Sequence, residues 1–205
     1  MVLGYHLILT AYGFWLPNDP RGSWSDFVGA WELLRFGRAT KVSTHRSLAR
    51  KPHNVERRIA AKKALLYPPV IFNGAQARAI IRSFAEIARS SYIVVHTCAI
   101  MPDHAHLVIV RHRLAIERIA NLLKGASTRR VVEEGIHPLA DHRLESGRFP
   151  KMWARGQWSV FLDSVAEIHR AIRYVENNPV REGLKPQSWR FVTLYVPSAR
   201  LGARG

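Results

Sequence analysis

The pair His104 and His106 constrains the fold and chemistry of this chain more than any other feature. Both lie in the run 100–110, Ile-Met-Pro-Asp-His-Ala-His-Leu-Val-Ile-Val, whose length and apolar content are typical of a buried strand. Side chains alternate between the two faces of a strand, so both imidazoles project from one face, while Ala105 and its aliphatic neighbours pack into the sheet. Two imidazoles on one face of a rigid strand can bind a divalent metal ion.

The charge of the chain limits the class of its partner. Its 205 residues include 31 Lys and Arg against 15 Asp and Glu, giving a net charge of +16. This excess favours a polyanionic partner, because each neutralised phosphate releases counterions. Nucleic acid is therefore the first candidate. An anionic membrane surface is the second candidate. It is disfavoured because every long amphipathic helix expected from the sequence packs its apolar face into the core, and none is left to bind a membrane.

The length predicts a single domain over residues 1–205. No apolar run approaches transmembrane length, and the N-terminus lacks the charged and apolar regions of a signal peptide, so we expect no membrane association. Cys98 is the only cysteine and cannot form an internal disulfide. A reducing cytoplasm fits these features.

The hydrophobic pattern predicts an α/β (α+β) fold. Expected strands cover residues 5–12, 93–101 and 104–110, with a candidate edge strand at 190–196, and expected helices cover 74–90, 115–133 and 164–177. Residues 135–157 are rich in loop-forming residues. We expect Pro179 to stop the last helix, because a residue before proline disfavours the helical conformation. The order of the elements predicts a central antiparallel sheet of four to five strands with helices packed on one face.

The last predicted helix has two distinct faces. Its core stripe follows helical spacing at Ile168, Ile172 and Val175. A second face carries Arg170, Tyr174 and Asn178, which follow one another at four-residue intervals. This face combines a cation, a phenol and an amide.

If this second face packs over the histidine strand, the combined groups can cleave a phosphodiester. His104, His106 and the amide oxygen of Asn178 would bind Mg²⁺ or Mn²⁺, leaving positions open for a phosphate oxygen and water. The Tyr174 phenol would be the nucleophile. Its ordinary pKa is about 10, so a cation or the metal must favour the phenolate. Attack would give a covalent phosphotyrosine, and rejoining would need no nucleotide cofactor.

Two segments resemble a known family. The run 101–107 resembles the HUH motif of the single-tyrosine transposases, and the run 173–184 resembles their tyrosine helix. The form Tyr-x-x-x-Asn-Pro-Val is most similar to the REP-associated tyrosine transposases and insertion-sequence-200-type relatives. The run 153–156, Trp-Ala-Arg-Gly, also resembles the segment before that helix. The resemblance covers roughly residues 1–12 and 75–190.

The resemblance implies a ferredoxin-like HUH endonuclease core that cleaves and rejoins single-stranded DNA at hairpin sites through a 5′-phosphotyrosine. It also implies that His104, His106 and Asn178 are metal ligands and that Tyr174 is the nucleophile, in a cytoplasmic, nucleoid-associated protein. Two departures stand out. Asp103 stands where many relatives have Asn, and residues 17–73 form a longer, basic insertion than the family domain requires.

The surface cations give further candidate DNA contacts. The candidate DNA contacts are Lys124, Arg155 and Arg170. Arg170 is equally consistent with a solvated surface cation that contacts no DNA. Between residues 35 and 63 the sequence has ten Lys and Arg residues and one acidic residue, and this excess of positive charge favours contact with a nucleic-acid backbone. In and near this segment, Trp15, Trp24 and Trp31 fit either base stacking or core packing. Among the other histidines, His6 is the one expected near the site, because the first strand should lie beside it.

Two other functions are also compatible with the sequence. The protein could be a non-catalytic nucleic-acid-binding descendant of the family, or an HUH replication or conjugation nickase. A nicking assay on hairpin DNA separates the first alternative. The sequence leaves open a monomer or a homodimer with exchanged tyrosine helices, and it does not give the DNA sequence recognised.

Overall fold

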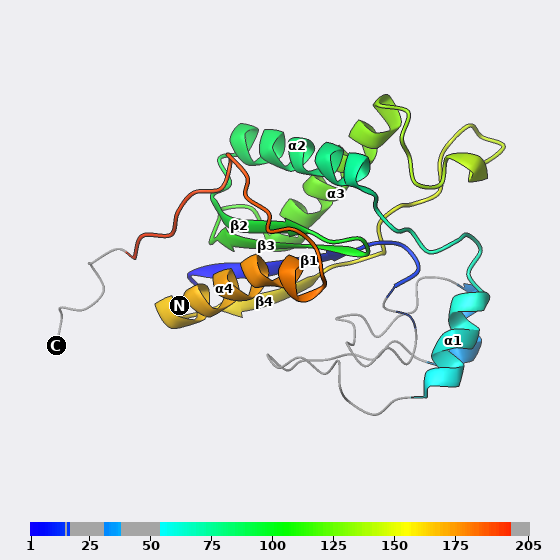
Figure 1. Ribbon diagram of the computed structural model, residues 1–205, viewed down its shortest axis with the longest axis horizontal. Helices are drawn as coiled ribbons and strands as arrows, with labels where there is room; N and C mark the ends of the chain where they lie inside the picture. Colours follow the sequence, from blue (N-terminus) through cyan, green and yellow to red (C-terminus); the bar gives the residue numbers. More distant parts are fainter. Residues whose placement is uncertain (15, 17–30, 38–53, 198–205) are drawn as a thin grey trace.

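The computed structural model describes residues 1–14, 16, 31–37 and 54–197 (Figure 1). Trp15, Trp24 and the cations between residues 38 and 53 lie outside these residues, as does the side chain of Trp31. The predicted roles of these groups therefore stay predictions.

The central sheet has four strands, and neighbouring strands all run antiparallel. The strands are β1 (Gly4–Thr10), β2 (Val95–Ile100), β3 (His104–Val110) and β4 (Trp158–Leu162). Their order across the sheet is β2-β3-β1-β4, so β1 and β3 are the two central strands. The fold class predicted from the sequence is confirmed.

Helices cover both faces of the sheet, whereas the sequence pattern predicted one face (Figure 1). On one face, α2 (Gly74–Ser90) and α3 (Ile116–Glu133) pack over the alternate residues of β1 and β3 that include Leu7 and Leu107. On the opposite face, α4 (Val165–Arg181) packs over a smaller apolar cluster. The prediction of a single covered face was wrong because β3 is apolar on both sides: Val108 belongs to the second cluster.

Helices α2 and α4 begin where the sequence predicts. Asn73 accepts a hydrogen bond from the Gln76 backbone N–H, and the Gln76 side chain accepts one from the Asn73 N–H, which makes a reciprocal capping box for α2. Ser164 caps α4 by accepting a bond from the Glu167 N–H. The Glu167 carboxylate accepts from the N–H of Asp163 and not from that of Ser164, so only half of a capping box forms at α4.

Two strand predictions need correction. Strand β4 was not anticipated, because Trp158–Leu162 directly follows a loop-rich stretch and precedes a helix start. The candidate edge strand at 190–196 does not form. This segment instead runs along the outer edge of β2, where the Thr193 N–H donates to the Val95 carbonyl. The Gln187 amide bonds both the N–H and the carbonyl of Ile100, so a side chain takes the place of a strand on that edge.

The end of α4 lies beyond the predicted stop. Pro179 is inside the helix, which continues to Arg181 and buries Asn178. The helix is terminated at Gly183, whose φ of 74° is in the left-handed region. The Gly183 N–H donates to the Val180 carbonyl and the Leu184 N–H to the Pro179 carbonyl, the two bonds of a Schellman motif. This motif fixes the helix turn that carries Asn178.

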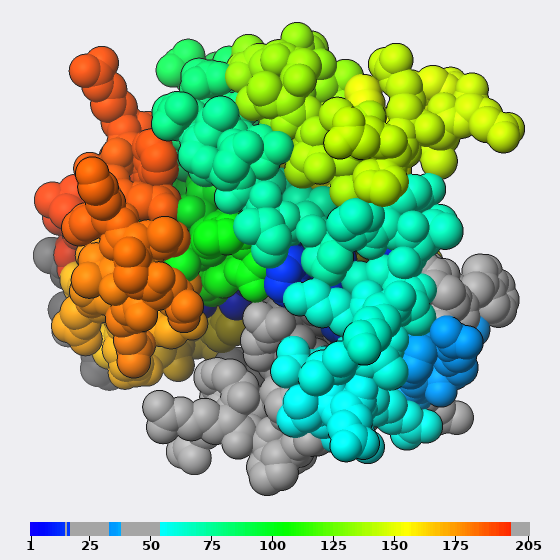
Figure 2. All heavy atoms as spheres, turned by 45° about the vertical axis from the view of Figure 1, so that its right-hand side comes forward, coloured from blue at the N-terminus to red at the C-terminus, as the bar shows by residue number. Residues whose placement is uncertain are grey.

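A small lobe lies beside the sheet. It contains the 3-10 helix η1 (Trp31–Phe36) and α1 (Val55–Lys63), joined by a satellite cluster of Leu16, Leu33 and Ala61. Figure 2 shows this lobe on one side of the molecule and α4 with the following residues on the other. Among the residues described by the structure, no helix has the length and apolar content needed to cross a membrane.

We predict that Gly183→Ala lowers the free energy of unfolding by about 1 kcal/mol, because an alanine in the left-handed region carries a steric penalty. No atom lies within 4 Å of the added Cβ, so packing does not obscure this penalty. Gly183→Asn is the matched control and should cost less, since asparagine tolerates this region. Urea unfolding monitored by circular dichroism measures both, and equal stability of Gly183→Ala and the native chain would contradict the assigned helix end.

Candidate active site

The two histidines of β3 project from the face that α4 covers. His104 Nε2 lies 2.8 Å from His106 Nε2, so the two imidazoles present the same kind of nitrogen to one point. His104 Nδ1, on the other side of its ring, donates to the Asp103 carboxylate over 2.5 Å. Asp103, which the resemblance marked as a departure, therefore orients His104.

A third histidine joins them from the neighbouring strand. The register pairs Ile8 with His106 and Thr10 with His104, which places alternate residues of β1, including His6, on the same face as the two histidines. His6 Nε2 lies 2.9 Å from His106 Nδ1. Burial, together with the nearby His104, lowers the pKa of His6 to about 4, and burial also lowers the pKa of His106. Both imidazoles are therefore neutral at pH 7 and keep a lone pair to share.

Helix α4 brings two of the predicted groups to the histidines. The Tyr174 ring centroid lies 5.5 Å from that of His106 and 5.8 Å from that of His6. Asn178 Nδ2 lies 3.4 Å from His104 Nε2, and its side chain is buried. The predicted convergence of His104, His106, Tyr174 and Asn178 is present within one chain.

Tyr174 is half-exposed, with 44% of its surface accessible. Desolvation by burial raises the pKa of its phenol, Arg181 lowers it, and Glu182 raises it further. The phenol is therefore protonated at pH 7 in the metal-free protein. Its hydroxyl needs an added positive charge, or a proton acceptor, before it can act as a nucleophile.

The donor set is compatible with a metal ion of mixed ligation. In the part of the chain described by the structure, no group of three or more His, Cys, Asp or Glu side chains could hold a metal ion. A site here needs a ligand of another kind, and the Asn178 amide is adjacent. Adjacent ligands of an octahedral cation at about 2.0–2.1 Å stand about 2.9 Å apart. The 2.8 Å between the two Nε2 atoms matches this spacing.

The three candidate DNA contacts lie in different settings. Lys124 Nζ donates to the carbonyls of Ala154 and Gly156, and burial and Lys151 lower its pKa to about 8. Arg155 is exposed and lines a groove together with Lys124. Arg170 is exposed on α4, with its guanidinium 3.8 Å from the Glu167 carboxylate.

The groove beside Lys124 lies between α3 and residues 149–156 and has a volume of about 620 Å³. Four cations line it: Lys124, Arg129, Lys151 and Arg155. Glu133 is the one acidic residue among its described lining residues. Sequence reasoning missed Arg129 and Lys151. The only signal for Arg129 was its position five residues after Lys124 on the same predicted helix.

Residues 152–156 are fixed between the groove and the sheet. The Ala154 N–H donates to the Thr10 carbonyl, and the Thr10 backbone pairs with His104, so the groove floor adjoins the histidine end of the sheet. The buried Trp153 indole N–H donates to the Ser127 hydroxyl over 2.9 Å. This bond and the two that Lys124 donates to the Ala154 and Gly156 carbonyls tie the segment to α3.

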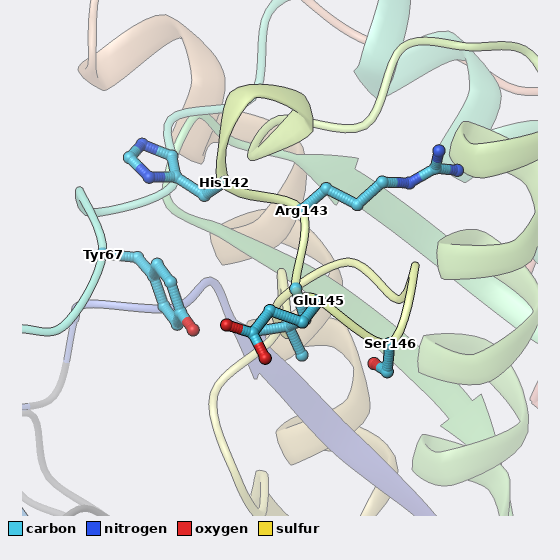
Figure 3. Close-up of a pocket in the computed structure, with 6 residues that line it drawn as sticks. Tyr67, His142, Arg143, Glu145 and Ser146 are labelled. Carbon is cyan, nitrogen blue, oxygen red and sulfur yellow. The ribbon is translucent and has the colours of Figure 1, made fainter.

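A separate hollow of about 580 Å³ lies between Tyr67 and residues 142–146 (Figure 3). The Tyr67 and His142 rings meet edge to face at 5.8 Å. Arg143 extends away from Tyr67 in Figure 3, and its guanidinium lies over the Phe149 ring. None of the predicted catalytic or metal-binding residues lines this hollow.

Comparison with known protein families gives a match to one family model. A family described as "Transposase IS200 like" matches residues 67–178, which include His104, His106, Tyr174 and Asn178. This span is more than half of the chain, and the chain belongs to that family. A search of curated proteins finds no match.

Two solved structures are similar to the chain. A REP-associated tyrosine transposase bound to a REP hairpin has 9% sequence identity and a TM-score of 0.45, over 88% of this chain and 68% of that chain. A proposed transposase from Deinococcus radiodurans R1 has 16% identity and a TM-score of 0.39, over 86% of this chain and 91% of that chain.

We predict that Ser127→Ala lowers the free energy of unfolding by about 1–3 kcal/mol, because it leaves the buried Trp153 N–H without this acceptor. Thr128→Val is the matched control: among the described residues its hydroxyl bonds only the Lys124 carbonyl, within the same helix, so a change of at most about 0.5 kcal/mol is expected. Thermal and urea unfolding measure both. Equal losses in the two variants would show that the Ser127 bond does not fix the groove segment.

Proposed function

We propose that this protein cleaves and rejoins single-stranded DNA through a covalent bond to Tyr174. The observation that carries the proposal is the convergence within one chain of the Tyr174 ring, the two Nε2 atoms of β3 and the Asn178 amide. Membership of the IS200-like transposase family and the net charge of +16 support DNA as the substrate.

His104, His106 and Asn178 are the residues that would hold Mg²⁺ or Mn²⁺. When bound, such an ion polarises a phosphate oxygen and offsets charge in the transition state. The His106 imidazole is neutral, and both imidazoles turn Nε2 toward one point. A half-turn of the Asn178 amide exchanges Nδ2 for Oδ1, which brings its oxygen to the same point.

Tyr174 supplies the nucleophile. Its phenolic oxygen forms a bond to phosphorus and loses its proton, and the bond from phosphorus to the 3′ oxygen breaks. The products are a 5′-phosphotyrosine and a free 3′-hydroxyl, and the reverse attack by a 3′-hydroxyl rejoins the strand. The exposed part of Tyr174 leaves room for a nucleotide beside the ring.

The cationic groove is the proposed path for the strand. Its positive side chains suit the backbone of an unpaired strand, and its floor continues to the histidine end of the sheet. The resemblance of residues 101–107 and 173–184 to the REP-associated tyrosine transposases supports a hairpin as the paired part of the substrate. Because all four site residues belong to one chain, we propose that a single copy suffices for cleavage.

We predict that Tyr174→Phe abolishes the covalent DNA adduct while leaving DNA affinity unchanged, because only the attacking oxygen is removed. A labelled hairpin oligonucleotide with Mn²⁺, followed by denaturing gel electrophoresis, measures the adduct. Tyr5→Phe is a matched control on the same sheet and should retain it. A denaturation-resistant complex in Tyr174→Phe would contradict the nucleophile assignment.

The same assay addresses the alternatives. His104→Ala should remove both the adduct and its dependence on the metal, so cleavage that resists EDTA in this variant would contradict the metal role. If the native chain binds the hairpin tightly and never cuts, the protein is a non-catalytic member of the family.

We predict that Lys151→Ala weakens binding of a single-stranded oligonucleotide and reduces the slope of log affinity against log salt by about 0.7, the value for one lost phosphate contact. Arg111→Ala is the control, since Arg111 follows β3 at the end opposite His104. Fluorescence anisotropy at several salt concentrations measures both slopes. Equal slopes for Lys151→Ala and the native chain would exclude the groove as the path of the strand.

A further inference from the structure

His6 has no role in the proposed reaction, yet it is buried at the centre of the site. It contacts both functional elements: its Nε2 lies 2.9 Å from His106 Nδ1, and its ring meets the Tyr174 ring edge to face. Only 9% of His6 is exposed. A histidine that loses its hydration in this way needs a compensating interaction, and the bond to His106 is the one that the structure provides.

The outer nitrogens of the two β3 imidazoles follow one pattern. His104 turns Nε2 toward His106 and gives Nδ1 to Asp103. His106 turns Nε2 toward His104 and gives Nδ1 to His6. Each candidate ligand therefore has a protein partner on the side away from the shared point. Histidines that bind metals commonly use such a partner to fix the tautomer and the ring orientation.

Metal binding through Nε2 would fix the tautomers. To offer a lone pair at Nε2, neutral His106 must carry its proton on Nδ1. That Nδ1–H can donate to His6 only if His6 Nε2 accepts, which places the His6 proton on Nδ1. Loss of the acceptor would leave the His106 Nδ1–H unsatisfied in a buried place. Moving the proton to Nε2 would relieve part of that cost and would remove the lone pair that a metal needs.

His6 is not placed to be a ligand itself. Its near nitrogen points at the Nδ1 side of His106, whereas the candidate ligand atoms meet on the Nε2 side. The absence of a three-histidine metal cluster among the described residues agrees with this geometry.

We propose that His6 is a positioning residue that holds His106 in the Nδ1-protonated tautomer, with Nε2 ready to bind a divalent ion. This inference rests on the proposed function, because it assumes that His104 and His106 bind the metal. It assigns to His6 a role that Asp103 performs for His104 through a carboxylate.

The test is calorimetric titration of the full-length, DNA-free chain with Mn²⁺. His6→Leu should weaken Mn²⁺ binding about 10–100-fold, the usual effect of removing a ligand's outer partner. His6→Gln retains an amide oxygen that can accept the Nδ1–H, and it should restore most of the affinity. His96→Leu is the matched control: His96 is also 9% exposed, and its Nδ1 bonds the Thr193 carbonyl at the outer edge of the sheet. This variant should bind Mn²⁺ like the native chain.

The outcomes separate this inference from the proposed function. If His104→Ala binds Mn²⁺ as tightly as the native chain, the metal assignment fails and the inference fails with it. If His104→Ala loses binding while His6→Leu retains full affinity, only the role of His6 is overturned.

A second measurement uses the native chain with Mg²⁺ and does not depend on whether His6→Leu folds. Two-dimensional ¹H–¹⁵N NMR of the imidazoles reports which nitrogen of His106 and of His6 carries the proton. With Mg²⁺ bound, the proposal expects both residues to carry the proton on Nδ1, so that His6 Nε2 accepts from His106. A His6 proton on Nε2 would overturn it.

Discussion

The register between the central strands β1 and β3 is the constraint on which the site depends. It pairs Thr10 with His104 and Ile8 with His106, so the alternating side chains of both strands put three imidazoles on one face. A slip of one residue would send His104 and His106 to the opposite face, against α2 and α3. The apolar residues between them prevent such a slip, because Leu7, Leu107 and their neighbours fill the main core. Core packing thus holds the histidines in place.

Helix α4 completes the site because the second face of the sheet is also apolar. Val175 is fully buried against that face, which fixes the rotation of α4 about its axis. The positions of Tyr174 and Asn178 are then set by the helical repeat. Pro179 fits within the helix, and the Gly183 motif closes it one turn later. The pKa values agree with this division of roles: burial keeps the His6 and His106 imidazoles neutral and leaves the Tyr174 phenol protonated until a positive charge is added.

Much of this arrangement follows from local sequence pattern, and the exceptions have physical causes. The strand with His104 and His106 and the helix with Tyr174 carry strong periodicity and two motifs, so their convergence was predictable. Strand β4 was missed because its five residues adjoin a loop-rich stretch, and its pairing with β1 is not a local property. The bond between His6 and His106 joins residues 100 positions apart, so no spacing in the sequence reveals it. The basic groove likewise needs α3 and residues 149–156 to meet.

The most direct measurement of the central claim is the anomalous diffraction of Mn²⁺ in crystals of the full-length protein with a hairpin oligonucleotide. The account predicts one strong peak within coordination distance of His104 Nε2, His106 Nε2 and the Asn178 amide oxygen, with the Tyr174 hydroxyl facing the phosphate on that ion. An ion bound elsewhere, or an occupied histidine pair with the Tyr174 hydroxyl turned away from the phosphate, would contradict it.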